Sequence, residues 1–338
     1  MNTPDVVHVV CTDSFAGVER YVSTLARWQD RMGSQVLVVG GAADRMPTEL
    51  AGTNVSWQPG PGWREAARAL RGLTPGVVHA HMTAAELAAV LTARAPVVAT
   101  RHFAQRRGNS PVARAVGRVL TARIAAQVAI SGFVADRVEG RSVIAHPGVP
   151  PAPEPPTDDR RPVVLIAQRL EPEKRTDLGL RIWAESGLAG RGWQLWIAGD
   201  GALRTELPSL ARRLGVAESV RFLGPRGDID HLLSTVGILL APRPDEPYGL
   251  SVVEAMAHGL PVAAGAGGGH DETVGTVPGA VLLPTRDTRA AGRLLAGLAA
   301  DPARRVRYGA ALRDAQHHRF DLASHAAAVA AVYAEVRR

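Results

Sequence analysis

The 338-residue sequence has very little cysteine and very little lysine: Cys11 and Lys174 are the only residues of these types. A single cysteine excludes an intramolecular disulfide and a cysteine-based metal cluster. It is also typical of a reducing compartment, so we expect a cytoplasmic protein. No stretch of eighteen residues lacks charge, and the first five residues contain no basic side chain. We therefore expect neither a membrane span nor a signal peptide.

Aromatic side chains are also scarce, at 4% of the residues, although the net charge is +7. The arginines that carry this charge are spread along the chain and form no basic run. Proteins that bind single-stranded nucleic acid combine a basic groove with aromatic side chains on which bases stack. The sequence therefore argues against a nucleic-acid partner, and its charge fits a small acidic substrate equally well.

All but one of the 39 cationic residues are arginine. A composition rich in Ala, Arg, Gly and Pro is typical of GC-rich coding, which replaces lysine by arginine wherever either serves. A lysine retained in such a chain indicates a position that needs a compact ammonium rather than a planar guanidinium. Lys174 is therefore a candidate functional residue.

Short apolar runs alternate with segments of helical period along the whole chain, which predicts an α/β protein with parallel sheets. The expected strands of the first half are Val6–Cys11, Gln35–Gly40, Val77–His81, Pro96–Thr100 and Gln127–Ser131. Those of the second half are Val163–Ala167, Gln194–Ala198, Val220–Leu223, Gly237–Ala241, Pro261–Ala264 and Ala280–Leu283.

A proline-rich segment, Pro147–Pro156, separates the two halves and predicts a linker of restricted flexibility. We expect two doubly wound domains, residues 1–150 and 151–321. We also expect an Ala-rich C-terminal helix, about 322–338, that packs back on the first domain. Ligands of such sheets bind at the carboxyl ends of the strands.

The strongest local signal is the segment from Pro242 to Val262. A buried strand ends at Ala241, a loop bounded by prolines follows, and a helix begins near Gly249. Free N–H groups at Gly249, Leu250 and Ser251 would bind phosphate oxygens at that helix start. Glu246 lies on the loop, and Glu254 lies one turn inside the helix, where its carboxylate can accept hydrogen bonds from ribose hydroxyls.

This segment resembles the E-x7-E motif of retaining glycosyltransferases, specifically glycosyltransferase family four. The resemblance implies the GT-B fold, with two Rossmann-like domains facing across a cleft. It also implies that Glu246 contacts the transferred sugar and Glu254 the nucleotide. The segment Ala167–Lys174 resembles the family's G-R-L-x-x-x-K-G element, whose Arg and Lys clamp the donor diphosphate, here Arg169 and Lys174. Gln168 and Arg175 depart from that pattern.

In the first half, Ser14–Arg20 resembles the family's G-G-x-E loop, with Gly17 as the residue that approaches the diphosphate and Ala16 in place of the first glycine. His102 ends a strand and resembles the family's histidine that contacts the transferred sugar. The neighbouring Arg101, Arg106 and Arg107 are candidates for binding an acidic acceptor.

Weaker matches surround the donor site. Gly199 resembles part of a G-x-G turn, Phe222 and Leu223 resemble a strand that lines the base pocket, and Gly267–Gly269 with Glu272 resembles the family's Gly-Gly-x-x-Glu turn. Ser131 and His146–Val149 match strand ends of the family for which we expect a structural role. Asp158-Asp159 forms no D-x-D motif. We therefore expect neither a metal ion nor another cofactor. We expect a UDP- or GDP-linked sugar as the co-substrate.

The resemblance implies retaining transfer to a hydroxyl of a small acceptor, such as a natural product or a sugar alcohol. A nucleotide-sugar epimerase or hydrolase of the same fold is an alternative. A basic helix expected at Trp63–Leu73 leaves a lipid-linked acceptor at the membrane surface open. A dinucleotide-binding oxidoreductase would need a G-x-G-x-x-G loop after the first strand, and the sequence has none there.

Overall fold

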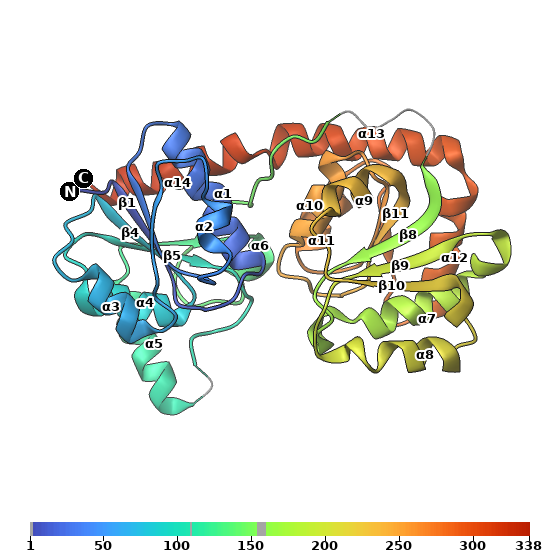
Figure 1. Ribbon diagram of the computed structural model, residues 1–338, viewed down its shortest axis with the longest axis horizontal. Coiled ribbons are helices and arrows are strands. Elements are labelled where there is room, and N and C mark those ends of the chain that lie inside the picture. Colours follow the sequence, from blue (N-terminus) through green and yellow to red (C-terminus); the bar gives the residue numbers. More distant parts are fainter. Residues whose placement is uncertain (1–2, 109, 154–159) are drawn as a thin grey trace. The chain divides into compact units, whose positions relative to one another are not determined.

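The computed structural model describes residues 3–108, 110–153 and 160–338, and the chain divides into two compact units (Figure 1). Unit 1 comprises Met1–Gly148 and Leu322–Arg338, and unit 2 comprises Val149–Asp321. Each unit contains one parallel sheet with helices on its faces, the architecture that strand–helix alternation predicts.

The sheet of unit 1 has seven strands in the order β3-β2-β1-β4-β5-β6-β7. Its strands are β1 (Val6–Val10), β2 (Val36–Gly40), β3 (Ser56–Gln58), β4 (Val77–His81), β5 (Val97–Arg101), β6 (Ala126–Ala129) and β7 (Val143–Ile144). Its helices are α1 (Gly17–Arg31), α2 (Met46–Glu49), α3 (Trp63–Leu70), α4 (Thr83–Thr92), α5 (Pro111–Arg123), α6 (Gly132–Ala135) and α14 (Leu322–Val336).

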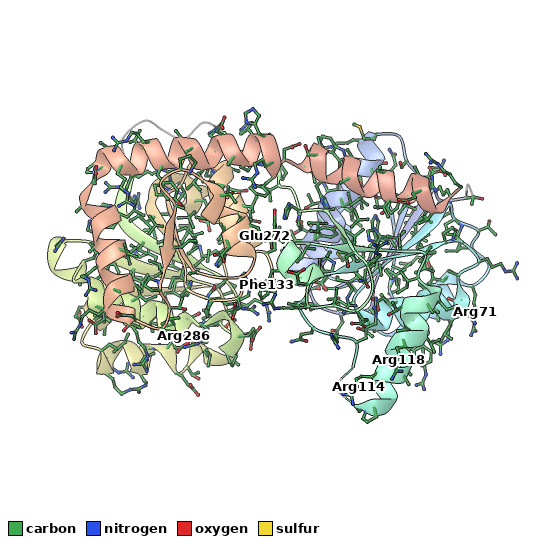
Figure 2. The ribbon with its side chains drawn as sticks, turned by 180° about the vertical axis from the view of Figure 1, so that it is seen from behind. Arg71, Arg114, Arg118, Phe133, Glu272 and Arg286 are labelled. Carbon is green, nitrogen blue, oxygen red and sulfur yellow. The ribbon has the colours of Figure 1, made fainter. Side chains whose placement is uncertain are left out.

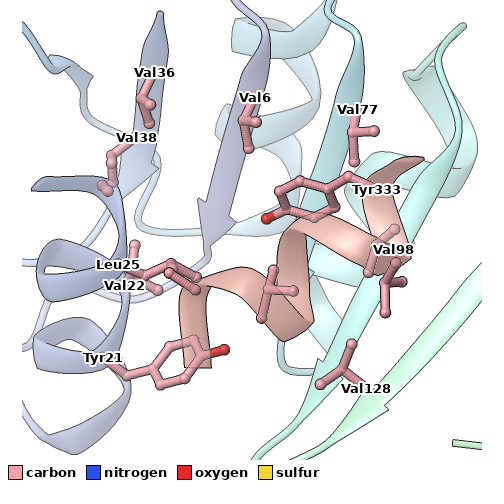
Figure 3. Packing of buried hydrophobic residues seen from close by; sticks show 14 of the residues in the cluster. Val6, Tyr21, Val22, Leu25, Val36, Val38, Val77, Val98, Val128 and Tyr333 are labelled. Carbon is pink, nitrogen blue, oxygen red and sulfur yellow. The ribbon is translucent and has the colours of Figure 1, made fainter. Parts of the chain in front are cut away.

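Two clusters of buried apolar residues cover the faces of this sheet. On one face, side chains of α1 and α14 pack on strand valines such as Val6, Val77 and Val98 (Figure 3). On the other face, residues of α3 and α4 pack on Val7, Val9 and their neighbours. Strands buried on both faces read as continuous apolar runs, which is why the sequence signals these elements clearly.

The sheet of unit 2 has six strands in the order β10-β9-β8-β11-β12-β13. Its strands are β8 (Arg161–Ala167), β9 (Gln194–Ala198), β10 (Val220–Gly224), β11 (Val236–Ala241), β12 (Val262–Gly265) and β13 (Val281–Leu283). Its helices are α7 (Thr176–Ser186), α8 (Leu207–Arg213), α9 (Ile229–Thr235), α10 (Leu250–Ala257), α11 (Gly269–Glu272), α12 (Thr288–Ala300) and α13 (Pro302–Arg319). Short 3-10 turns join several of them, including Pro172–Lys174.

All the strands expected from the sequence are present, with ends shifted by at most two residues. Two strands were not expected, β3 and β7, at the two edges of the first sheet. β3 has three residues and β7 has two, so both are too short to give the apolar pattern that signals a strand.

The described part of the proline-rich segment is fixed to α13. Val149 donates its N–H to the carbonyl of Phe320 (3.1 Å), and the Gln316 amide donates to the carbonyl of Val149 (3.0 Å). Arg313 donates to the carbonyls of Ala152 and Pro153. The rest of the segment, with Asp158-Asp159, lies outside the described residues. Among the described helices, none has both the length and the apolar character needed to cross a bilayer.

Candidate functional site

The start of α10 follows directly from the sequence around it. The strand β11 is buried along its whole length, and Pro242, Pro244 and Pro247 prevent it from continuing. Gly249 precedes the helix with φ +93°, a conformation that glycine adopts without strain, and no side chain caps the helix. The carbonyl of Gly249 accepts the N–H groups of Val252 (2.9 Å) and Val253 (3.2 Å), so the N–H groups that precede them at the helix start are the ones that can bind an anion.

Glu246 lies beside this helix start and is buried. Both of its carboxylate oxygens accept hydrogen bonds from Nζ of Lys174, at 2.8 and 3.0 Å, and a guanidinium nitrogen of Arg243 lies 3.5 Å away. Burial alone would raise the pKa of Glu246, but the charges of Lys174 and Arg243 outweigh it and lower that pKa. Glu246 is therefore a carboxylate at neutral pH.

Lys174 is positioned by the 3-10 turn that ends with it. Gln168 holds this turn, since its side-chain amide donates to the carbonyl of Lys174 (2.9 Å) and to Oγ1 of Thr176 (3.0 Å). Arg175 has φ +54°, a left-handed conformation in which glycine is unstrained. The two departures from the family pattern thus have distinct physical consequences: Gln168 adds contacts, and Arg175 adds strain.

Arg169 lies between β8 and the 3-10 turn, and its side chain is 50% exposed. Its guanidinium donates to Glu173 at 2.9 Å, in an ion pair on the surface. The structure therefore brings Lys174 and Glu246 together, and it pairs Arg169 with a different carboxylate.

The glycine turn after β12 packs against the Glu246 loop. Gly269 donates its N–H to the carbonyl of Glu246 (2.7 Å), and an added Cβ at Gly268 would lie 2.4 Å from that carbonyl oxygen. His270 follows and is buried; its Nδ1–H donates to the carbonyl of Gly265 (2.9 Å). Its Nε2 faces Gly249, 3.0 Å from where a Cβ would stand there.

Sequence reasoning missed His270, although a histidine in that turn was visible. Burial, the largest effect, lowers the pKa of His270, so the ring is neutral and its Nε2 offers a lone pair. A neutral acceptor beside the helix start and Glu246 belongs to the same site.

The other predicted donor residues, apart from Gly17, lie on the same unit. Glu254 is half-buried on the second turn of α10, and Leu250 and Ser251 form its first turn. Phe222 and Leu223 are half-buried on β10. Gly199 follows β9 with φ +146°, and an added Cβ would lie 1.9 Å from the carbonyl oxygen of Gln168. Only glycine allows these two strand ends to approach so closely.

In unit 1, Gly17 is exposed at the start of α1. The buried carboxylate of Glu19 holds this loop by accepting from the N–H of Ala16 (2.8 Å) and from the hydroxyl of Thr12 (2.7 Å). The Glu of the G-G-x-E-like loop thus shapes the turn, which the motif alone did not reveal. Ser131 accepts from the N–H of Val134 and caps α6.

His102 directly follows β5 and is 8% exposed. Its Nε2 lies 3.1 Å from Nδ1 of His81, and the ring of Tyr21 packs edge-on against it. Burial is the largest of the effects that lower the pKa of His102 to about 3, so the imidazole is neutral.

Two of the three arginines predicted to bind an acceptor have another role. Arg107 is buried and ion-paired with Glu86 and Glu139, and Arg101 is buried and lies 3.6 Å from Glu139. Their charges are neutralised inside unit 1, so we do not retain them as acceptor-binding residues. Arg106 is exposed and stays a prediction.

Two family models together match residues 15–314. Residues 152–314 match the model described as glycosyl transferases group 1, and residues 15–152 match the model described as glycosyltransferase family 4.

Curated relatives match over part of their length. The chain is 28% identical over 221 residues to a 2-deoxystreptamine glucosyltransferase of Streptomyces kanamyceticus, covering 61% of this chain and 55% of that protein. It is 32% identical over 228 residues to a D-inositol 3-phosphate glycosyltransferase of Streptomyces avermitilis, covering 59% and 49%. The chain thus spans about half the length of these relatives.

Solved structures share the fold over nearly the whole chain. A glycosyltransferase of Rickettsia africae superposes with a TM-score of 0.79 at 17% identity, covering 99% of both chains. HepE of Anabaena, in complex with UDP and glucose, superposes with a TM-score of 0.79 at 18% identity, covering 98% and 99%. On the family models and the fold, the chain belongs to glycosyltransferase family 4 and has two Rossmann-like domains of the GT-B type.

Proposed function

We propose that this chain is a retaining glycosyltransferase that moves a sugar from a nucleoside diphosphate-sugar to a hydroxyl of a small acceptor. The observation that carries the proposal is the Lys174–Glu246 pair beside the uncapped start of α10. A cation, a carboxylate and free backbone N–H groups are what a diphosphate and the hydroxyls of its sugar require.

The donor would replace contacts that the chain makes with itself. The diphosphate would accept from the N–H groups of Gly249, Leu250 and Ser251, and Lys174 would turn from Glu246 to the diphosphate oxygens. Glu246 would then accept hydrogen bonds from sugar hydroxyls, and Glu254 from the ribose. Arg169 would leave its exposed partner Glu173 for the same diphosphate, since an exposed ion pair contributes only about 0–1 kcal/mol.

The main requirement of the reaction is to stabilise the negative charge that builds on the leaving diphosphate. Lys174, Arg169 and the N–H groups at the start of α10 would meet it. The acceptor hydroxyl would attack on the face that the diphosphate leaves, and a phosphate oxygen would take its proton. Such a step needs little acid–base chemistry from the protein and retains the anomeric configuration. We propose that no metal ion takes part, because the cations of the chain serve that purpose.

The names of the relatives support a substrate class. The names of the two Streptomyces relatives give polyhydroxylated six-membered rings as acceptors, 2-deoxystreptamine and D-inositol 3-phosphate. HepE was crystallised with UDP and glucose. We propose a small polyhydroxylated acceptor of this kind and a UDP- or GDP-linked donor.

A lipid-linked acceptor at the membrane surface is the second candidate, and α5 is the observation that favours it. This helix exposes Val116 and Val119. Arg114 and Arg118 are exposed on the same helix (Figure 2). Apolar and basic side chains on one exposed helix are typical of contact with an anionic bilayer. The helix α3 fits this role less well, because Ala66, Ala67 and Leu70 are buried in the core of unit 1 and Trp63 is its one exposed large apolar side chain.

The test is an incubation of the protein with UDP- and GDP-sugars, inositol and aminocyclitol acceptors, and EDTA. We expect a glycosylated small acceptor by mass spectrometry and a retained anomeric configuration from proton coupling constants. An inverted linkage, or turnover that needs added magnesium or manganese, would contradict the proposal. Release of free sugar without any acceptor would indicate the epimerase or hydrolase alternative. Product formed only with glycolipid acceptors in anionic vesicles would indicate the membrane alternative.

A further inference from the structure

Unit 1 contains a group of buried polar side chains between its sheet and the helices α1 and α14. The parallel pairing of β1 with β4 sets His8 opposite His79 and Val10 opposite His81, so three histidines share one face of the sheet. Tyr21 and Tyr333 project from α1 and α14 toward this face (Figure 3). The nine members are Gln29, His8, His79, His81, His102, Thr100, Tyr21, Tyr333 and His325, and all are buried.

One hydrogen-bonded chain, here the His102 chain, runs from Gln29 to the carboxyl end of β5. Oε1 of Gln29 lies 2.7 Å from Nε2 of His8, and Nδ1 of His8 lies 3.1 Å from Nε2 of His81. Nδ1 of His81 then lies 3.1 Å from Nε2 of His102. The chain thus joins α1, β1, β4 and the end of β5.

A second chain begins at the other end of the same amide. Nε2 of Gln29 donates to the hydroxyl of Tyr333 (3.4 Å), and that hydroxyl lies 2.6 Å from Nδ1 of His79. Nε2 of His79 lies 2.6 Å from Oγ1 of Thr100. This branch does not include His102.

These contacts account for every ring nitrogen of His8, His79 and His81. Three buried histidines whose nitrogens lie within 4.8 Å of one another could also hold a metal ion. A metal would take lone pairs that already accept hydrogen bonds in the two chains. The side chains as they stand are satisfied without an ion, so they form a hydrogen-bond network.

The amide of Gln29 gives the His102 chain a direction. An amide oxygen only accepts, so Nε2 of His8 must donate to it, and Nδ1 of His8 must then accept from Nε2–H of His81. By the same rule Nδ1 of His81 accepts from Nε2–H of His102. The Nδ1 atom of His102 is left with a lone pair, and it has no hydrogen-bond partner within the part of the chain that the structure describes.

We propose that Gln29, His8 and His81 are positioning residues that hold His102 as its Nε2–H tautomer, so that Nδ1 accepts a hydrogen bond from a substrate hydroxyl. The role of that hydroxyl rests on the proposed function, whereas the tautomer does not. Burial supports the assignment, because it lowers the pKa values of His8 to about 4 and of His102 to about 3 and keeps both rings neutral. A neutral imidazole nitrogen accepts a hydrogen bond from a hydroxyl proton, whereas a protonated imidazole would donate to the sugar oxygen instead.

The test compares two conservative variants of the same buried network. Gln29→Met keeps an unbranched side chain of similar length and removes the acceptor that directs the His102 chain. Tyr333→Phe removes one hydroxyl from the second chain and is the matched control for loss of stability. Imidazole tautomers are assigned from long-range proton–nitrogen correlation spectra of the 15N-labelled protein. Activity is then measured with the donor and acceptor found for the parent.

We expect the parent and Tyr333→Phe to show the Nε2–H tautomer at His102, and Gln29→Met to show a mixture or the reverse tautomer. We also expect kcat of Gln29→Met to fall roughly three- to tenfold, the value of one hydrogen bond, while affinity for the nucleotide alone stays within about twofold. The Nδ1–H tautomer in the parent, an unchanged tautomer in Gln29→Met, or stoichiometric bound zinc would overturn the proposal. If no donor turned over, the proposed function would fail, and the spectra would still decide the tautomer.

Discussion

At the scale of single residues, Lys174 donates to both oxygens of the buried carboxylate Glu246. A compact ammonium can leave one oxygen and reach a phosphate with little rearrangement. A guanidinium in the same place would form a planar two-point pair with Glu246 and release it less readily. The geometry therefore gives a physical reason for the one lysine of the sequence.

We predict that Lys174→Arg lowers kcat about 10²-fold and that Lys174→Ala lowers it by about 10²–10³. Lys174→Ala should also lower the free energy of unfolding by about 1–3 kcal/mol, since the carboxylate of Glu246 loses its closest partner. Arg289→Ala, which removes an exposed cation elsewhere on unit 2, is the control. Steady-state kinetics and urea unfolding check both effects, and activity of Lys174→Ala within twofold of the parent would refute the role of this lysine.

Arg175 is the second residue whose conformation makes a prediction. Its left-handed φ of +54° costs an ordinary residue about 1–2 kcal/mol, and its ion pair with Asp177 is half exposed and offsets only part of that. We predict that Arg175→Gly changes the free energy of unfolding by less than about 1 kcal/mol and leaves activity intact. Arg175→Val should destabilise the protein, because a β-branched side chain tolerates this conformation worst. Equal stability of the two variants in urea unfolding would contradict the conformation.

The sequence indicated the candidate residues of the site better than it indicated the residues that they contact. Lys174 and Glu246 were expected in one site, and they lie in contact. The contacts of Gln168, Glu19 and His270 were not predictable from the sequence, because they depend on how the loops fold back on one another. Arg101 and Arg107 were misjudged because the carboxylates that neutralise them, Glu86 and Glu139, lie far away in sequence.

At the scale of elements, the buried strands were predictable because burial on both faces leaves a continuous apolar run in the sequence. The edge strands β3 and β7, of three and two residues, are too short to leave such a run. The histidines of β1 and β4 had a visible alternation, but the register that brings them together is a property of the sheet.

The close approach of β8 and β9 at Gly199 gives an element-scale prediction. Gly199→Ala would place a methyl group 1.9 Å from a backbone oxygen. We expect a loss of about 2–4 kcal/mol in the free energy of unfolding, because backbone atoms cannot move aside without breaking the strand ends. Gly190→Ala is the control, since an added Cβ there meets nothing within 4 Å. Thermal and urea unfolding of the pair measure the difference, and similar curves would contradict it.

At the scale of the whole molecule, the two units should respond differently to acid. His8, His102 and His325 have pKa values lowered from 6.5 to about 4, 3 and 4, mainly by burial, and the pKa values of His79 and His81 are lowered in the same direction. Below pH 6.5 the unfolded chain binds protons that the folded unit 1 does not. Their contribution to stability is therefore complete above pH 6.5 and is lost as the pH falls toward 4.

We predict that unit 1 begins to open near pH 5, where each such histidine costs about 2 kcal/mol against a total stability of about 5–15 kcal/mol. Unit 2 is the internal control, because His258 and His270 are its only described histidines with lowered pKa values. Hydrogen exchange, followed by mass spectrometry and corrected for the intrinsic effect of pH, reports on each unit separately. Equal protection of both units at pH 5 would contradict the buried neutral histidines.

The proposed nucleotide site at the start of α10 is tested most directly by titration calorimetry of UDP and GDP in the presence of EDTA. The protein should bind at least one of the two nucleotides without any added metal. Lys174→Ala should weaken this affinity at least about tenfold, the value of one charge-assisted contact, while Arg289→Ala should leave it unchanged. Binding that appears only with magnesium, or an affinity that survives the loss of Lys174, would contradict the site.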